Sequence, residues 1–230
     1  MNMMASLEEI RKKLLRLEDT IIHSLFDRSQ YKFNNIIYTQ GGIEIPGFNG
    51  SFFEYLFEGT EKLHDSAGRY IDSEQHPFFI TPQKPLISRK IDDRGIESKV
   101  NSNDKILSAY MENLPIICED GDDNMYGSSA LADINCLQTI SQRVHIGEQV
   151  AESKFRENPN EYIKLIRSKD TDGLTSKLRN IKVEEEVLER VKTKGERYGI
   201  YPTLIYNFYK RNIIPFTIEV EVKYFLGKEL

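Results

Sequence analysis

The sequence has few cysteines, no long apolar run and no excess of basic residues. Only two of its 230 residues are cysteines, Cys118 and Cys136, which is too few for a disulfide framework and is typical of reduced thiols. No run of about 18 apolar residues is present, so no membrane-spanning helix is expected. The formal net charge is -5, which argues against a nucleic-acid binder because such a protein needs a basic face.

The first residues also lack the marks of a targeting segment. The stretch MNMMASLEEIRKKLLRLEDT enters a charged, amphipathic pattern almost at once, without an apolar core region. We therefore expect a cytoplasmic protein. Internal repeats and low-complexity tracts are absent and 39% of the residues are hydrophobic, so we expect a folded chain with a real core, in one large domain or two small ones.

Apolar residues recur at intervals of three and four along most of the chain, which predicts helices. Ser6 and Glu9 form a capping-box pattern before a long amphipathic helix, and Ser51 and Glu54 repeat the pattern before residues 51–71. Further helices are predicted over 103–117, from Ser128 or Ser129 to about 157, and over 160–169, 172–180 and 183–198, the last ended by Gly199. Two segments, 34–50 and 72–100, are predicted to be irregular from their composition.

The segment 217–225, TIEVEVKYF, is compatible with two structures. Apolar and polar residues alternate, which predicts a strand. The same residues also fit a helix with Thr217, Glu221 and Phe225 on one face, and Pro215 would kink that helix. The pattern alone leaves both possibilities open.

Several charged residues occur at spacings that place them on one helix face. Arg143 and Lys154 are separated by about three helical turns, so both would point the same way. Gly147 and Ala151 lie between them, and such small residues would leave room for a bulky group beside two cations. The alternative is a solvated face with surface ion pairs.

Two further pairs share this property. Asn180 and Glu184 are four residues apart, and so are Thr217 and Glu221 if the last segment is helical. Arg11 lies at the edge of the apolar stripe of the first predicted helix. Spacing alone does not show that these residues converge.

Blocks of sequence along most of the chain resemble the chorismate mutases of plants and fungi. They are EEIRKKLLRLEDTIIHSLFDRSQ, GFNGSFFEYLFEGTEKLHDSAGRY, HPFF, EDGDDNMYGSSALADINCLQTISQRVHIGEQVAESKF, VEEEVLERV, YG and PFTIEVEVKYFL. The resemblance implies a single domain over residues 1–230, an all-helical bundle with irregular connecting loops in which residues 217–225 are helical. It also implies an isomerase that converts chorismate to prephenate without cofactor or metal.

The resemblance further implies which residues carry the reaction. The catalytic residues would be Arg11, Arg143, Lys154, Glu184 and Glu221, with Asn180 and Thr217 in substrate binding. In this family the arginines clamp the two substrate carboxylates. The lysine and a protonated glutamic acid donate hydrogen bonds to the ether oxygen.

An effector site and a homodimer are also implied by the resemblance. The effector, tyrosine or tryptophan, would contact Arg69, Asn124, Gly127 and Ser128. Met125 and Leu131 depart from the fungal pattern, and the connection after Gly199 is short, which weakens this prediction. Gly127 and Ser128 are equally explained as a tight turn with a helix N-cap.

Two other classes of protein are alternatives to an enzyme of this family. A catalytically dead helical scaffold is disfavoured because every active-site residue has the family's type. A di-metal helical bundle needs two Glu-x-x-His motifs, and Glu61 with His64 is the only match. We therefore expect no metal.

Overall fold

The computed structural model describes residues 7–87 and 100–229, and all regular structure within these ranges is helical. The α-helices are α1 (Leu7–Ser29), α2 (Phe52–Ser66), α3 (Asn103–Ile117), α4 (Tyr126–His145), α5 (Gly147–Glu157), α6 (Pro159–Arg167), α7 (Thr171–Leu178), α8 (Ile181–Tyr198), α9 (Pro202–Phe208) and α10 (Ile214–Leu226). The predicted all-helical fold class is confirmed. Within the described residues, no helix has the length and apolarity needed to cross a bilayer.

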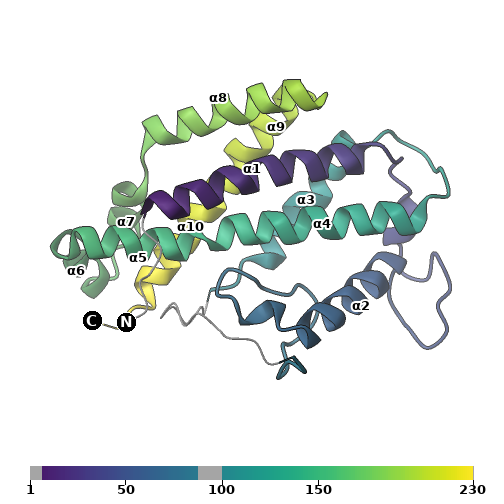
Figure 1. Cartoon of the computed structure of the whole chain (residues 1–230), viewed down its shortest axis with the longest axis horizontal. Coiled ribbons are helices and arrows are strands. Elements are labelled where there is room, and N and C mark those ends of the chain that lie inside the picture. Colours follow the sequence, from purple (N-terminus) through teal and green to yellow (C-terminus); the bar gives the residue numbers. More distant parts are fainter. Residues whose placement is uncertain (1–6, 88–99, 230) are drawn as a thin grey trace.

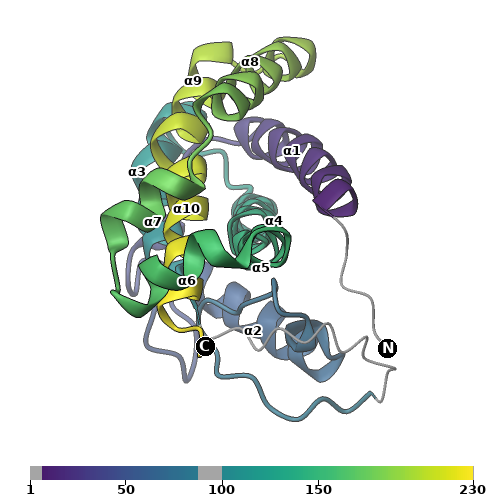
Figure 2. The same ribbon diagram turned by 90° about the vertical axis from the view of Figure 1, so that its left-hand side faces the viewer.

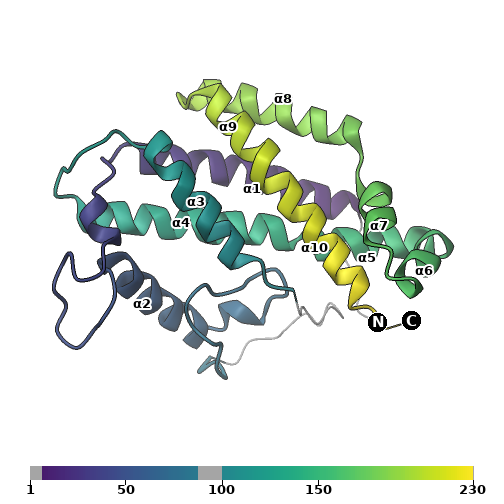
Figure 3. The same cartoon turned by 180° about the vertical axis from the view of Figure 1, so that it is seen from behind.

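Two long helices, α1 and α4, lie side by side through the middle of the molecule (Figure 1). Helix α8 packs along α1, and α2 packs against α4 on the opposite side (Figure 2). Helices α9 and α10 form an almost continuous rod that crosses α4 and α5 and lies in front of them in Figure 3. The C-terminal rod therefore meets the junction between α4 and α5.

The main core lies between these helices and contains one buried polar network. Arg28 of α1 and Asp133 of α4 are both fully buried, and Nε of the arginine lies 2.6 Å from Oδ1 of the aspartate. The hydroxyl groups of Tyr38 and Tyr110 donate to the same carboxylate at 2.5 and 2.7 Å. Three elements, α1, α3 and the 3₁₀ helix η1 (Asn35–Tyr38), are thus bonded to one carboxylate of α4.

Helix ends follow the predicted signals in some places and differ in others. The Ser51–Glu54 capping box is present, and α8 ends at Gly199 with a φ of 76°, a conformation that glycine adopts without strain. Ser6 lies outside the described residues. Helix α4 begins at Tyr126, so the prediction that Ser128 caps it is wrong.

The predicted helix from Ser128 to 157 is two helices that meet at Ile146. Gly147 begins α5 at the point where α10 comes closest. A Cβ atom on Gly147 would lie 2.8 Å from the backbone oxygen of Thr217, so only glycine allows this approach. The room beside Gly147 is therefore filled by α10. The expectation that it accommodates a bulky group is wrong.

The segment 217–225 is helical, and the strand alternative is wrong. Before it, Tyr209–Ile213 form a π-helical segment, η3, which joins α9 to α10. Pro215 follows at the start of α10. A proline clashes with the carbonyl group four residues earlier, here that of Arg211, and lacks an N–H donor. The wider π turn absorbs this clash where a kink was expected.

Candidate active site

Four of the predicted site residues come together where α10 crosses the α4–α5 junction. Nη1 of Arg143 lies 3.3 Å from the Thr217 hydroxyl oxygen, and Nζ of Lys154 lies 2.8 Å from Oε2 of Glu221. Arg143 belongs to α4, Lys154 to α5 and the other two to α10. We call these four residues the α10 cluster. Their spacing in the sequence had left open whether they converge, and the structure brings these four together.

Burial sets the electrostatics of the α10 cluster. It raises the pKa of the Glu221 carboxyl group, and the positive charges of Lys154 and Arg143 offset this only in part. Glu221 is thereby biased toward its protonated form, which can donate a hydrogen bond. Nε of Arg143 is buried and has no hydrogen-bond partner among the described residues. A buried charged donor without a partner is costly, and a bound anion would satisfy it.

Asn180 and Glu184 lie at the start of α8, beside this cluster. The side-chain oxygen of Asn180 accepts a hydrogen bond from the backbone N–H of Val183 at 3.2 Å and caps α8, which leaves its NH₂ group as a donor. Glu184 is held by Arg179 through hydrogen bonds of 3.1 and 2.6 Å. Leu178, the last residue of α7, accepts a hydrogen bond from Nζ of Lys154 at 3.0 Å. No described hydrogen bond joins Asn180 or Glu184 to the α10 cluster.

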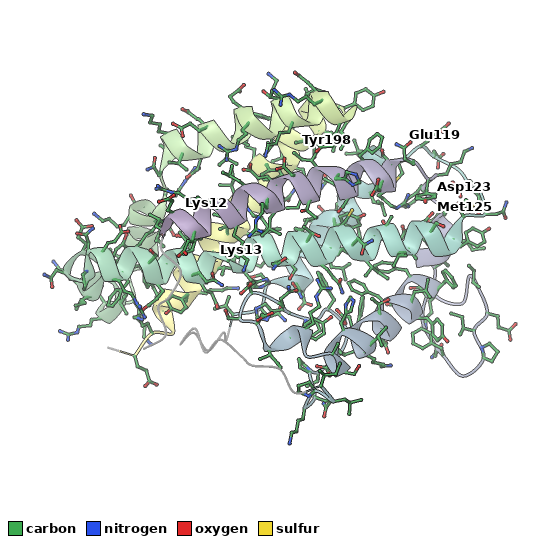
Figure 4. The ribbon with its side chains drawn as sticks, in the orientation of Figure 1. Lys12, Lys13, Glu119, Asp123, Met125 and Tyr198 are labelled. Atoms are coloured by element: carbon green, nitrogen blue, oxygen red, sulfur yellow. The ribbon has the colours of Figure 1, made fainter. Side chains whose placement is uncertain are left out.

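Arg11 is exposed on α1, and no hydrogen bond or ion pair within the described residues joins it to the α10 cluster. Figure 4 labels its neighbours Lys12 and Lys13 towards the middle of the molecule and Asp123 and Met125 at its right-hand end. The turn predicted to bind an effector is therefore remote from the start of α1.

Sequence reasoning missed a buried ionic group next to Arg143. Glu18 of α1 is only 1% exposed and accepts hydrogen bonds from Nε and Nη2 of Arg190 at 2.8 and 2.7 Å. The charge of Glu18 and the hydroxyl group of Tyr209 both act on the guanidinium of Arg143. An acidic residue directly after the apolar Leu17 in an amphipathic helix was the available signal.

The predicted effector residues lie in two separate places within one chain. Arg69 donates to Gln75 at 2.9 Å and lies 3.1 Å from Nδ1 of His64, which is 3.3 Å from Nε2 of Gln138. Ser128 is ten residues before Gln138 on α4, about 15 Å along the helix axis. Arg69 therefore packs near the middle of α4, while Ser128 lies at its start.

The other effector residues belong to the turn before α4. Asn124 has a φ of 60°, and its backbone N–H donates to the Asp122 carboxylate at 2.8 Å. Gly127 is exposed, with open space where a Cβ atom would stand. The surface of this turn is accessible in a single chain.

The Glu-x-x-His match is occupied by other interactions. Glu61 accepts hydrogen bonds from the backbone N–H groups of Phe78 and Phe79 at 2.5 and 2.9 Å. His64 contacts Arg69, as described above. Across residues 7–87 and 100–229, no group of three His, Cys, Asp or Glu side chains is arranged to hold a metal ion.

The fold and the site define a helical protein with a buried cationic cluster suited to a small anionic ligand. A family model described as Chorismate mutase type II matches residues 125–222. This stretch contains every predicted active-site residue except Arg11.

Comparisons with known proteins extend the match to nearly the full chain. Chorismate mutase of Saccharomyces cerevisiae is 39% identical, over 97% of this chain and 95% of that protein. Chloroplastic chorismate mutase 1 of Petunia hybrida is 38% identical, over 97% of this chain and 76% of that protein.

Solved structures of chorismate mutases have a fold similar to that of this chain. The chorismate mutase of Candida albicans in complex with L-Trp has a TM-score of 0.88 and 34% identity, over 96% of this chain and 90% of that chain. AtCM1 with phenylalanine bound in its allosteric site has a TM-score of 0.87 and 37% identity, over 97% of this chain and 96% of that chain. The chain belongs to the chorismate mutase family, which confirms the resemblance found in its sequence.

Proposed function

We propose that this chain binds chorismate and converts it to prephenate by an intramolecular Claisen rearrangement, in the supply of phenylalanine and tyrosine. The observation that carries the proposal is the α10 cluster. It combines a buried guanidinium with an unpartnered Nε, an ammonium group and a carboxyl group whose pKa is raised by burial. Membership of the family supports the same reaction.

The chemistry needs few functional groups. The ether C–O bond breaks while a C–C bond forms within the same molecule, so no nucleophile is needed and no proton must leave. The enzyme contributes by holding the side chain of chorismate folded over its ring and by stabilising the charge that develops on the ether oxygen. A site for this reaction therefore needs clamps for two carboxylates and donors for one oxygen.

Lys154 and Glu221 are the donors for the ether oxygen in this proposal. The ammonium group of Lys154 has three N–H bonds, and Leu178 and Glu221 accept two of them. One remains for the ether oxygen. Protonated Glu221 supplies the second donor, and this role is lost when its carboxyl group ionises.

The remaining residues bind the rest of the substrate. Arg143 takes one carboxylate through its free Nε, and Arg11 approaches the other from α1. Thr217 donates its hydroxyl proton to the Ile213 carbonyl oxygen at 2.7 Å, so it must rotate to donate to a carboxylate. Glu184 accepts from the ring hydroxyl group, with the NH₂ group of Asn180 beside it.

The direct test is loss of the ultraviolet absorbance of chorismate with purified protein, in the presence of EDTA, and identification of prephenate as the product. Lys154→Ala should lower kcat/KM on the order of 100-fold, by analogy with the loss of an oxyanion-stabilising donor. Lys164→Ala, on the exposed side of α6, is the matched control and should leave it unchanged. No turnover by folded wild-type protein would favour a catalytically dead scaffold.

We also propose a homodimer that binds tyrosine or tryptophan at Arg69, Asn124, Gly127 and Ser128. Family members with an aromatic amino acid in an allosteric site support this. The separation of Arg69 from Ser128 within one chain supports a site shared by two chains. Kinetics unchanged by millimolar tyrosine, tryptophan or phenylalanine would contradict the effector role, and sedimentation of a monomer would contradict the dimer.

The predicted location and domain organisation remain predictions. Plant relatives, however, include chloroplastic proteins. A single domain over residues 1–230 is supported by the near-complete overlap with the yeast relative.

A further inference from the structure

The segment that joins α7 to α8 contains or contacts more than one residue of the proposed site. Leu178, the last residue of α7, accepts a hydrogen bond from Lys154, and Asn180, just before α8, is itself a proposed substrate-binding residue. Arg179 lies between them. The sequence pattern predicts no role for Arg179. In the structure its guanidinium is directed at Glu184.

The contact between Arg179 and Glu184 is a two-point ion pair. Nε lies 3.1 Å from Oε1 and Nη2 lies 2.6 Å from Oε2, so the planar guanidinium faces the whole carboxylate. The Arg179 side chain is 51% exposed, whereas that of Glu184 is 16% exposed. The arginine thus covers a mostly buried carboxylate from the solvent side.

Arg179 and Glu184 both line a pocket that lies outside the α10 cluster. This pocket of about 780 Å³ opens between α7, α8, α9 and α10, and its lining includes Arg179, Glu184, Ile218 and Val222. No member of the α10 cluster lines this pocket. Ile218 and Val222 each lie one residue after a cluster member, about 100° further around α10. Glu184 therefore lines this pocket on the outer side of α10, and from there its charge still adds to burial in raising the pKa of Glu221.

We propose that Arg179 is a positioning residue that holds Glu184 on this outer side, so that chorismate must compete with Arg179 for the Glu184 carboxylate. The inference rests on the proposed function, because it assigns Glu184 to the ring hydroxyl group of the substrate. Breaking the ion pair frees the carboxylate before the substrate arrives. The substrate then binds more tightly, and the chemical step itself is unaffected.

The expected change in KM is opposite in sign to the change that loss of a nearby positive charge usually causes. Removing a cation near a binding site for a dianion normally weakens binding, because the local potential becomes less favourable. Here the loss of Arg179 should lower KM for chorismate. The change should be about two- to fivefold, the range that half-exposed ion pairs give, with kcat altered less than twofold.

The experiment is steady-state kinetics on full-length variants whose folding is checked by thermal melting. Arg179→Ala should show the full fall in KM. Arg179→Lys should show a smaller fall, because lysine keeps the charge but cannot face both carboxylate oxygens. Lys177→Ala is the matched control, since it removes an equal charge two residues away whose partner is Glu161, at 2.7 Å. It should not lower KM.

A second pair of variants tests whether Arg179 acts through Glu184. In a Glu184→Gln background, where the ion pair is already lost, Arg179→Ala should have no further effect on KM. An unchanged or raised KM in the single Arg179→Ala variant would overturn the inference, and so would an equal fall in the Glu184→Gln background. Absence of turnover by the wild-type protein would instead overturn the proposed function, and the inference with it.

Discussion

Asp133→Asn should destabilise the fold nearly as much as Asp133→Ala, although asparagine almost matches aspartate in shape. The reason is Arg28, whose side chain is fully buried and whose Nε lies 2.6 Å from the Asp133 carboxylate. Without that negative charge, the guanidinium is left buried and uncompensated. Its remaining acceptors include the carbonyl oxygens of Tyr31 and Lys32, at 3.2 and 3.1 Å, which carry no net charge.

The magnitude follows from the complete burial of both partners. Removing one member of a buried ion pair typically costs about 3–5 kcal/mol. For a domain of this size, each kcal/mol corresponds to about 2–4 °C in melting temperature, so the fall should be roughly 6–20 °C. The total stability of natural domains is only about 5–15 kcal/mol, so this is a large share of it.

Thermal and urea unfolding followed by circular dichroism would measure the effect. Lys105→Ala is the control, because its partner Glu219 lies 2.6 Å away but the Lys105 side chain is 54% exposed. That variant should lose less than about 1 kcal/mol. An Asp133→Asn variant within about 1 kcal/mol of the wild type would refute the argument, because it would show that the charge of Asp133 is not required.

Three further predictions concern single positions. Activity should decline as the pH rises through the raised pKa of Glu221, because only the protonated form donates; Glu221→Gln should flatten this decline, and an unchanged profile would exclude the donor role. Gly147→Ala should cost about 1–3 kcal/mol in unfolding free energy and also reduce kcat, because α10 must move; wild-type values for both would contradict the close approach. Ser51→Ala should cost about 1 kcal/mol through loss of the α2 capping box, measured by urea unfolding, and no change would show that the cap is dispensable.

Local signals were enough to predict most of the helices. The apolar spacing of α1 and α8 reflects faces that bury residues such as Ile21, Leu25 and Val191 against neighbouring helices. Ser51 and Gly199 fixed helix ends because their effect is confined to one turn of backbone. Such features depend on residues only a few positions apart.

Features set by contacts between distant elements could not be predicted from spacing. The need for glycine at Gly147 arises from the approach of α10, which is about seventy residues away in the sequence. The helical state of 217–225 is likewise decided by packing, because the alternating pattern fits either structure. Only the family resemblance selected the helix.

The candidate site likewise has features that the sequence predicted and features that it did not. The types and spacings of Arg143, Lys154 and Glu221 were readable from the sequence, and the structure places them close together. The ion pair of Glu184 with Arg179 could not be predicted from the sequence, because it spans a linker between two helices where no helical spacing rule applies. Long, flexible side chains find partners across such linkers that a pattern cannot specify.

The π-helical segment Tyr209–Ile213 has a consequence for how the chain can change length. A π turn accommodates one more residue than an α turn, and each residue turns a helix by about 100°. Deleting a single residue there would restore a regular α-helix without breaking the rod. Because the extra residue is taken up within one turn, Thr217 and Glu221 would still point in nearly the same direction. The direction of the α10 side chains is thus insensitive to the presence of the extra residue, and the rod could lose or gain one residue at this segment without turning Thr217 and Glu221 to another face.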